Sequence, residues 1–166
     1  MSKYLLDTNI VLDAQSAEIL GALNFSMFYV SYLVLYDEIL KQVSNFNYEN
    51  IMIIKETNTQ IGEVVSITSR NNKISTYDAI NLVLARDYNF TLVTGDQKLK
   101  DEAIKYNIKC IGTLGLIKKL IEINKISVVE AIIGLEKLKS SPDRRIPHQL
   151  IDKLVVELKE GNKKLV

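Results

Sequence analysis

The sequence lacks the residues on which several common catalytic sites depend. It contains one cysteine, Cys110, one histidine, His148, and no tryptophan. A single cysteine cannot form an internal disulfide, so we expect a buried free thiol and a protein of the reducing cytoplasm. A single histidine excludes ribonucleases that use two histidines as acid and base. The shortage of both residues excludes a cysteine–histidine zinc site, and no Walker loop or G-x-G-x-x-G turn occurs.

Proline and glycine are also scarce, and long apolar runs are absent. Two prolines and seven glycines among 166 residues argue against flexible linkers and predict one domain. The first apolar run ends at Asp7, and no apolar run reaches the roughly 18 residues of a membrane span. We therefore expect neither a signal peptide nor a contact with the membrane.

The small net charge of +1 hides an uneven distribution. Residues 1–96 carry 6 basic and 11 acidic side chains, whereas residues 97–166 carry 15 basic and 9 acidic ones. An acidic part beside a basic part suits a metal site next to a surface that binds a polyanion. The alternative is that the lysines simply cover the solvent faces of amphipathic helices.

Strand-like and helix-like segments alternate along the first two thirds of the chain. This alternation predicts an α/β fold with crossover connections and a parallel sheet. The expected strands are residues 3–7, 25–30, 51–56, 90–94 and 108–111. The expected helices are residues 14–23, 32–43, 59–70, 76–85, 97–106, 114–123, 127–138 and 147–158, followed by a frayed tail at 159–166.

Residues 76–96 are the most informative stretch. The helix from Ala79 to Ala85 is apolar on all sides, and Asp78 and Asn81 are its only polar neighbours, one turn apart. Such a helix is normally buried, and a carboxylate there needs a partner or a cation. The strand that follows ends just before Asp96. Ligands of parallel α/β sheets gather at such strand ends.

Other acids fall at the ends of other strands. Asp7 ends the first strand, and Asp37 and Glu38 lie in the helix after the second. If the strands are parallel, these acids converge with Asp78 and Asp96, and a divalent cation would relieve their repulsion. Oxygen ligands suit Mg²⁺ or Mn²⁺, which can activate water against a phosphodiester.

Each of these acids also has a simpler interpretation. Asp78 can complete a capping box with Ser75, Asp96 can cap the next helix, and Asp7 can cap a turn. Asp37 and Glu38 can be solvent-facing acids on their helix. Only their shared position at one sheet edge favours a metal site.

Four motifs, in the same order, resemble those of PIN-domain nucleases. They are Tyr4-Leu-Leu-Asp7-Thr-Asn, the helix acid after Val30-Ser31, Asp78-Ala-Ile-Asn-Leu-Val-Leu-Ala85 and Leu92-Val-Thr-Gly-Asp96. The resemblance implies a three-layer fold with a five-stranded parallel sheet over residues 1–124. It also implies helices over residues 125–166 that pack on the same domain, as in a subgroup with extra C-terminal helices.

The same resemblance implies a Mg²⁺- or Mn²⁺-dependent ribonuclease, many relatives being toxins of toxin–antitoxin pairs. Carried over by position, Asp7, Asp78 and Asp96 are metal ligands, and Asn9 and Thr94 are supporting polar groups. The second motif departs from the family pattern, which usually has Glu. Two observations favour Asp37: counting from Ser31 without a gap reaches it, and it borders the apolar face of its helix. The local sequence Glu-Ile-Leu favours Glu38 instead.

Binding partners follow from the charge and the apolar stripes. Lys98, Lys100, Lys118 and Lys119 are candidates to hold an RNA backbone. The stripe of Leu150, Ile151, Leu154, Val155 and Leu158 is expected to pack in the core, although it also permits a dimer or antitoxin contact.

Two alternatives from other classes remain. The first is a PIN-like protein that binds nucleic acid without cleaving it. The second is a Mg²⁺-dependent phosphatase, which would usually need a second acid where Asn9 stands. A receiver domain fits less well, because its acid pair and its lysine at the last strand end are not evident.

Overall fold

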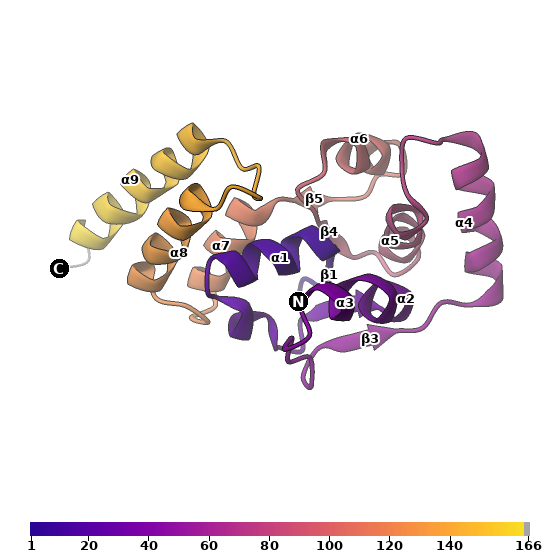
Figure 1. The fold of residues 1–166 in the computed structure, drawn as a ribbon, viewed down its shortest axis with the longest axis horizontal. Coiled ribbons are helices and arrows are strands. Elements are labelled where there is room, and N and C mark those ends of the chain that lie inside the picture. The colour runs from indigo at the N-terminus through magenta and orange to yellow at the C-terminus, as the bar shows by residue number, and fades with distance from the viewer. Residues whose placement is uncertain (165–166) are drawn as a thin grey trace.

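The computed structural model describes residues 1–164 and consists of a parallel sheet between two layers of helices (Figure 1). The strands lie in the order β3-β2-β1-β4-β5 and are all parallel, which confirms the expected fold class. They are β1 (Tyr4–Leu6), β2 (Phe28–Ser31), β3 (Met52–Ile54), β4 (Thr91–Val93) and β5 (Cys110–Ile111).

Helices cover both faces of the sheet. The chain adds β2 and β3 on one side of β1 and then β4 and β5 on the other side, so its right-handed crossovers place helices on opposite faces. α1 contacts the helix after β2, whereas α5 contacts α4 and α6. The helices are α1 (Thr8–Ser16), α2 (Tyr32–Val34), the π turn η2 (Leu35–Ile39), α3 (Leu40–Gln42), α4 (Asn58–Arg70), α5 (Thr76–Asp87), α6 (Gln97–Lys105), α7 (Thr113–Glu122), α8 (Val128–Ser140) and α9 (His148–Lys164). No helix within residues 1–164 has the length and apolar character needed to cross a bilayer.

The strand order changes direction at β1, which lies between β2 and β4. Leu6 of β1 pairs with Val93 of β4, so both strands end at the same level of the sheet. A switch point of this kind leaves a crevice at the carboxyl ends of the strands, where α/β proteins usually bind ligands.

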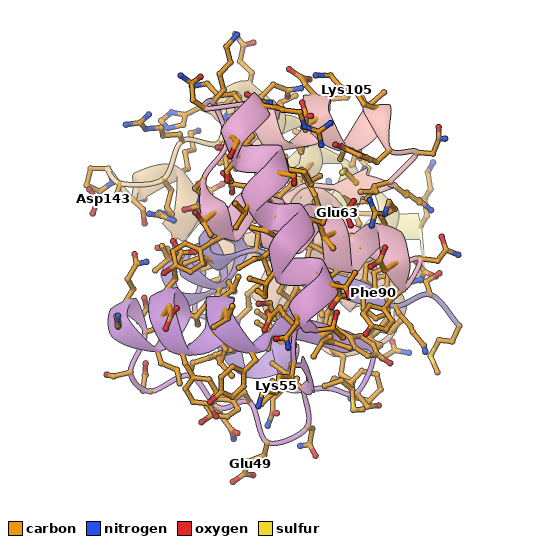
Figure 2. All side chains as sticks on the ribbon, turned by 90° about the vertical axis from the view of Figure 1, so that its right-hand side faces the viewer. Glu49, Lys55, Glu63, Phe90, Lys105 and Asp143 are labelled. Atoms are coloured by element: carbon orange, nitrogen blue, oxygen red, sulfur yellow. The ribbon has the colours of Figure 1, made fainter. Side chains whose placement is uncertain are left out.

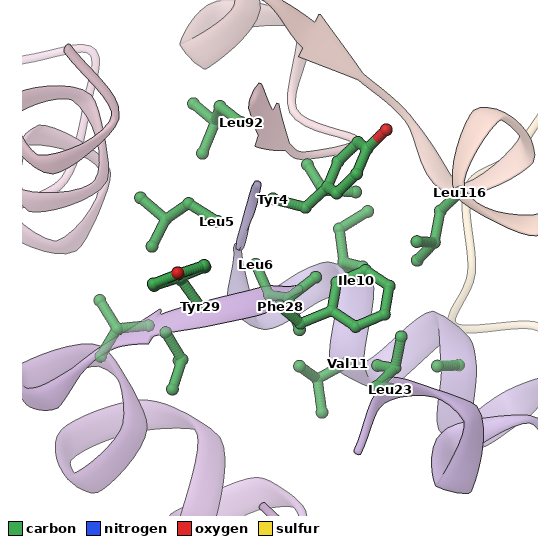
Figure 3. Packing of buried hydrophobic residues seen from close by; sticks show 14 of the residues in the cluster. Tyr4, Leu5, Leu6, Ile10, Val11, Leu23, Phe28, Tyr29, Leu92 and Leu116 are labelled. Atoms are coloured by element: carbon green, nitrogen blue, oxygen red, sulfur yellow. The ribbon is translucent and has the colours of Figure 1, made fainter. Parts of the chain in front are cut away.

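The centre of the sheet supplies the core. All residues of β1 and β4 are buried, and Figure 3 shows Leu5, Leu6 and Leu92 packed with Phe28 and Tyr29 of β2. All seven residues from Ala79 to Ala85 of α5 are buried, as the apolar stretch predicted. This core holds the strand ends rigidly beside the start of α5.

The first helix begins earlier than the sequence indicated. α1 starts at Thr8, and Asp7 is its N-cap, whereas a helix was expected only from residue 14. The expected helix 14–23 divides into the end of α1 and a short 3₁₀ turn, Leu20–Leu23. Asp7 is thus the single residue between the end of β1 and the start of α1, and both elements fix its backbone.

The buried face of the helix after β2 differs in part from the one that its apolar spacing predicts, which is Tyr32, Leu33, Tyr36, Ile39, Leu40 and Val43. Ile39 and Val43 are buried as predicted, but Tyr32 and Tyr36 are each 40% exposed, and Val34 and Leu35 are buried instead. The reason is the π turn, since a turn with i→i+5 bonds advances the helix by less than about 100° per residue.

α4 is also rotated relative to the face that its apolar spacing predicts, which is Ile61, Val64, Val65 and Thr68. Val64 is buried as predicted, but Val65 is 59% exposed and Ile67 is buried instead. Gln60 is buried because its side chain closes a capping box with Thr57 and donates to Asp87 of α5 at 3.0 Å. Arg86 of α5 pairs with Glu63, which Figure 2 shows on the face of α4 toward the viewer. These polar contacts set the rotation of α4.

The C-terminal helices α8 and α9 lie at the opposite end of the molecule from α4 (Figure 1). Ile151, Leu154 and Val155 of the predicted stripe are buried, whereas Leu150 is exposed. α9 continues through Lys164, so residues 159–164 of the expected tail are helical, and residues 165–166 lie outside the described residues.

We expect Gly134→Ala to destabilise the protein, because α8 crosses α1 at this glycine. A Cβ on Gly134 would lie 2.9 Å from the carbonyl oxygen of Ala17, and such overpacking costs about 1–3 kcal/mol. Gly62→Ala in α4 is the matched control, since nothing lies within 4 Å of its Cβ. The control should gain about 0.5–1 kcal/mol from helix propensity. Urea denaturation measures both, and equal stability of the two variants would contradict the close crossing.

Candidate functional site

Asp7 occupies the centre of the candidate site, at the carboxyl end of β1. Its Oδ1 accepts a hydrogen bond from the backbone N–H of Thr8 at 2.8 Å. Its Oδ2 accepts one from the hydroxyl of Thr94 at 2.8 Å. The residue is only 5% exposed, so this carboxyl group is held in one position by the two neighbouring strands.

The surroundings of Asp7 disfavour its negative charge. The pKa of Asp7 is raised from 3.8 to about 7. Burial is the largest cause and the charges of Asp78 and Glu38 add to it, while the hydrogen bonds from Thr94 and Thr8 lower the pKa. A carboxyl group that resists ionisation beside two other acids is the environment that a cation would relieve. Asp78 and Glu38 are thus near enough to Asp7 for their charges to act on it.

Thr94 connects Asp7 to Asp96. The same hydroxyl that donates to Asp7 accepts a hydrogen bond from the backbone N–H of Asp96 at 3.1 Å. The Asp96 side chain caps α6 through Leu99 N at 3.0 Å. Asn9 and Asp96 line one cavity of about 300 Å³. Thr94 and Asn9 thus lie where the sequence motifs put them, beside two of the acids.

Asp78 closes the capping box of α5, and its charge acts on Asp7. Its Oδ2 accepts from Ser75 N at 2.8 Å, which is the capping box that the sequence offered as the simpler interpretation. One turn later, Asn81 is fully buried, and neither atom of its amide has a hydrogen-bond partner among the described residues. Buried amides are normally paired, so Asn81 marks a position where a further polar atom belongs.

The structure places Glu38, not Asp37, next to the first strand. The hydroxyl of Thr8 donates to Glu38 Oε1 at 2.8 Å, and the Glu38 charge acts on Asp7. Asp37 is exposed and lies 3.5 Å from the hydroxyl of Tyr77. The helix-face argument for Asp37 was wrong because it assumed an unbroken α-helix, whereas both acids lie in the π turn. Turns of this kind often occur at functional sites.

These acids do not form a finished metal cage. Within residues 1–164, no three carboxylate, imidazole or thiol side chains gather closely enough to hold an ion together. Mg²⁺ usually needs only one or two carboxylates and keeps several waters. The carboxyl group of Asp7, whose pKa is raised, and the neighbouring acids fit such an ion as oxygen ligands. The unpaired amide of Asn81 offers one further oxygen.

A second buried acid, Asp13, was missed in the sequence. It is 6% exposed, accepts a hydrogen bond from the hydroxyl of Thr113 and lies 3.3 Å from Arg144 Nη1. Burial raises the pKa of Asp13, while Thr113 and Arg144 oppose that shift. The signal available was its place one turn after Asn9 on the same helix face. Arg144, 131 residues away in sequence, gave no local signal.

The four predicted RNA-binding lysines lie in three places. Lys100 lines a cavity next to Gly95 and Gly112, close to the acidic edge. Lys98 lines a separate cavity on the α4 side of α6. Lys118 and Lys119 are on α7, paired with Glu157 at 3.5 Å and Glu122 at 3.0 Å.

One solved structure shares the fold of this chain. A crystal structure of PAE2754 from Pyrobaculum aerophilum matches 73% of this chain and 98% of its own, with a TM-score of 0.54 and 14% identity, which shows a shared fold. A PilT N-terminus domain protein, SSO1118 from Sulfolobus solfataricus P2, matches 75% of this chain and 93% of its own, with a TM-score of 0.44 and 13% identity. No match was found among curated proteins.

The family comparison covers nearly the whole chain. The family model DUF3368, described as a PIN domain, matches residues 5–160. The match includes β1 and Asp7 at one end and continues past residue 124 through most of the C-terminal helices. The protein therefore belongs to the PIN-domain family, whose members are generally nucleases.

Proposed function

We propose that the protein is a Mg²⁺- or Mn²⁺-dependent endoribonuclease. The observation that carries this proposal is Asp7, a buried carboxyl group with a pKa of about 7 at the switch point of the sheet, next to Asp78 and Glu38. In such a site an acid is costly without a cation. A role as the toxin of a toxin–antitoxin pair extends the proposal and rests on the resemblance of the motifs.

Asp7 and one of the acids near it, Glu38, Asp78 or Asp96, would hold the ion directly, and the others would act through the waters that Mg²⁺ keeps. A bound ion would supply a Lewis acid and a water of lowered pKa near the phosphodiester. Thr94 fixes Asp7 and the backbone of Asp96, while Thr8 fixes Glu38. These hydroxyls come from the residue directly after β4 and from the start of α1, so the acids are held next to the ends of rigid elements.

The direct test is metal-dependent cleavage of single-stranded RNA by the purified chain. We expect cleavage with Mn²⁺ or Mg²⁺ that leaves 5′-phosphate and 3′-hydroxyl ends, and no cleavage in EDTA. Removing the metal should leave the protein folded, because the core does not depend on the site. Cleavage that persists in EDTA, or that leaves cyclic phosphates, would contradict the proposal.

One observation favours a second candidate, a PIN-like protein that binds nucleic acid without cleaving it. Asp78 and Asp96 each use a side-chain oxygen to cap a helix, and no three acids form a cage within the described residues. The same experiment separates the two functions. Binding of RNA without cleavage at any divalent metal concentration would favour this candidate.

We expect Glu38→Gln to reduce cleavage about 10–100-fold, because the variant loses a charge next to Asp7. Asp37→Asn should change it less than about twofold, since Asp37 is exposed on the same π turn. The glutamine amide that replaces the Glu38 carboxylate keeps an acceptor oxygen for Thr8, so both variants should fold. The values of kcat/KM under equal metal conditions measure the difference. The reverse order would identify Asp37 as the acid that acts.

A further inference from the structure

The cavity beside Asp96 extends away from the acids to the loop between α8 and α9. This cavity, of about 300 Å³, is lined by Asn9 and Asp96 on one side and by Asp143, Arg144 and Arg145 on the other. Figure 2 shows Asp143 on this loop, projecting from the body of the molecule. The C-terminal helices therefore bring two arginines to the edge where the candidate site lies.

Arg144 has a partner that fixes the loop. Its guanidinium lies 3.3 Å from Asp13, and both side chains are largely buried. Asp13 also accepts a hydrogen bond from Thr113, so α1, α7 and the loop meet at this one carboxylate. The charge of Arg144 is balanced within the protein, and its contact with Asp13 is structural.

Arg145 differs from its neighbour. It is exposed, and within residues 1–164 it has no ion-pair partner. It also lines an adjacent cavity of about 290 Å³, together with Lys100 and Gly95. The ammonium of Lys100 lies against Gly112, 3.2 Å from where a Cβ on that glycine would be. Arg145 thus lines both cavities: it shares one with Asp96 and the other with Lys100.

A polyanion that approaches the acidic edge meets repulsion there and needs compensation nearby. Arginine suits this purpose, because its planar fork can bind two oxygens of one phosphate. In the cavity beside Asp96, Asp13 is paired with Arg144, which leaves Asp96 and Asp143 near Arg145, whereas the adjacent cavity that Arg145 shares with Lys100 has no carboxylate from the described residues in its lining.

We propose that Arg145, with Lys100, forms a phosphate subsite that holds the RNA backbone next to the acidic edge, and that the Asp13–Arg144 ion pair positions the loop carrying it. This inference rests on the proposed function and adds to it a role for the C-terminal extension. The bound group is a phosphodiester of single-stranded RNA a short distance from the acids.

The test measures binding without cleavage. A fluorescein-labelled single-stranded oligoribonucleotide is titrated with the full chain in EDTA, and its anisotropy is followed at several salt concentrations. Arg145→Ala should weaken binding about five- to tenfold and lower the slope of log K against log salt by about 0.7. Arg145→Lys should fall between the alanine variant and the wild type, because it keeps the charge but loses the fork.

Arg70→Ala is the matched control. Arg70 is an exposed arginine on α4 that lines the separate cavity next to Lys98. It carries the same charge and should change affinity less than about twofold. Circular dichroism and the melting temperature should be unchanged in all variants, since both arginines are exposed.

The outcomes separate this inference from the proposed function. If Arg145→Ala and Arg70→Ala weaken binding equally, or neither does, the subsite is refuted while the nuclease proposal stands on its cleavage assay. If the wild type binds RNA through Arg145 but never cleaves it with metal, the subsite stands and the nuclease proposal falls. A wild type that does not bind RNA refutes both.

Discussion

We expect Asp7→Asn to abolish metal-dependent cleavage and, in the absence of metal, to make the protein more stable. The loss of cleavage should be on the order of a thousandfold or more, since several kcal/mol of transition-state stabilisation by the ion depend on this carboxylate. Asparagine keeps the shape of the side chain and an acceptor for Thr94 or Thr8. The variant should therefore fold and still bind RNA.

The gain in stability follows from the pKa of Asp7. Burial raises it from 3.8 to about 7 in the folded protein, so the folded state holds a proton that the unfolded state releases. The stability of the wild type should therefore fall as the pH rises from about 4 to about 7, and then level off. Above pH 7 the cost is at most about 4 kcal/mol. The asparagine side chain of the variant does not ionise, so the variant avoids this cost.

Urea denaturation in EDTA at pH 5 and pH 8 measures the effect. The stability difference between Asp7→Asn and the wild type should be larger at pH 8. Adding Mn²⁺ at pH 8 should stabilise the wild type through binding to its folded state, but not the variant. Glu49→Gln removes one charge from an exposed loop position (Figure 2) and should show neither effect. A variant less stable than the wild type at pH 8 in EDTA would contradict this account of Asp7.

We also expect Asp78→Asn and Asp96→Asn to separate helix capping from chemistry. Both carboxylates accept backbone hydrogen bonds at helix starts, from Ser75 N at 2.8 Å and from Leu99 N at 3.0 Å. At the N-cap position of Asp96 asparagine is as good as aspartate, and at the N3 position of Asp78 it keeps an acceptor for Ser75 N, so the free energy of unfolding should change by less than about 0.5 kcal/mol. Cleavage should fall on the order of a hundredfold or more, because a charge that can hold the ion is lost.

The chain contains a matched control for this prediction. Glu130 closes a capping box with Ser127 at the start of α8, accepting from Ser127 N at 2.7 Å. Glu130→Gln should leave both stability and cleavage close to the wild type. Full cleavage by Asp78→Asn or Asp96→Asn would show that these acids are only caps, and the ratio of kcat/KM values decides between the two roles.

Residue patterns were sufficient for the main features of the fold. The alternation of β-rich and helical segments predicted a parallel sheet, and the apolar run from Ala79 to Ala85 predicted the buried helix α5. Asp7 and Asp96 were predicted to meet at the strand ends, and the structure links them through Thr94, whose hydroxyl binds the Asp7 carboxylate and the Asp96 backbone. The predictions of the sheet and of α5 succeeded because crossover connections make the strands parallel, whatever their exact lengths.

The predictions failed where local geometry departs from the ideal period. The choice between Asp37 and Glu38 depended on the rotation of one helix, and the π turn at 35–39 changes that rotation. No proline or glycine within the turn signals it. The face of α4 was misjudged for a similar reason, since Gln60 and Arg86 make polar contacts between α4 and α5 that hydrophobic periodicity does not register.

By itself the sequence determined the parallel sheet and the positions of Asp7 and Asp96 just beyond the ends of two of its strands, because local periodicity and the crossover connections fix both. Only the tertiary structure decided which acid of the π turn lies beside Asp7, and that Arg144 and Arg145 reach the same edge from the C-terminal helices. The Asp13–Arg144 contact joins residues 131 positions apart. Such a pair depends on how α1, α7 and α8 pack in three dimensions, which no short stretch of sequence encodes.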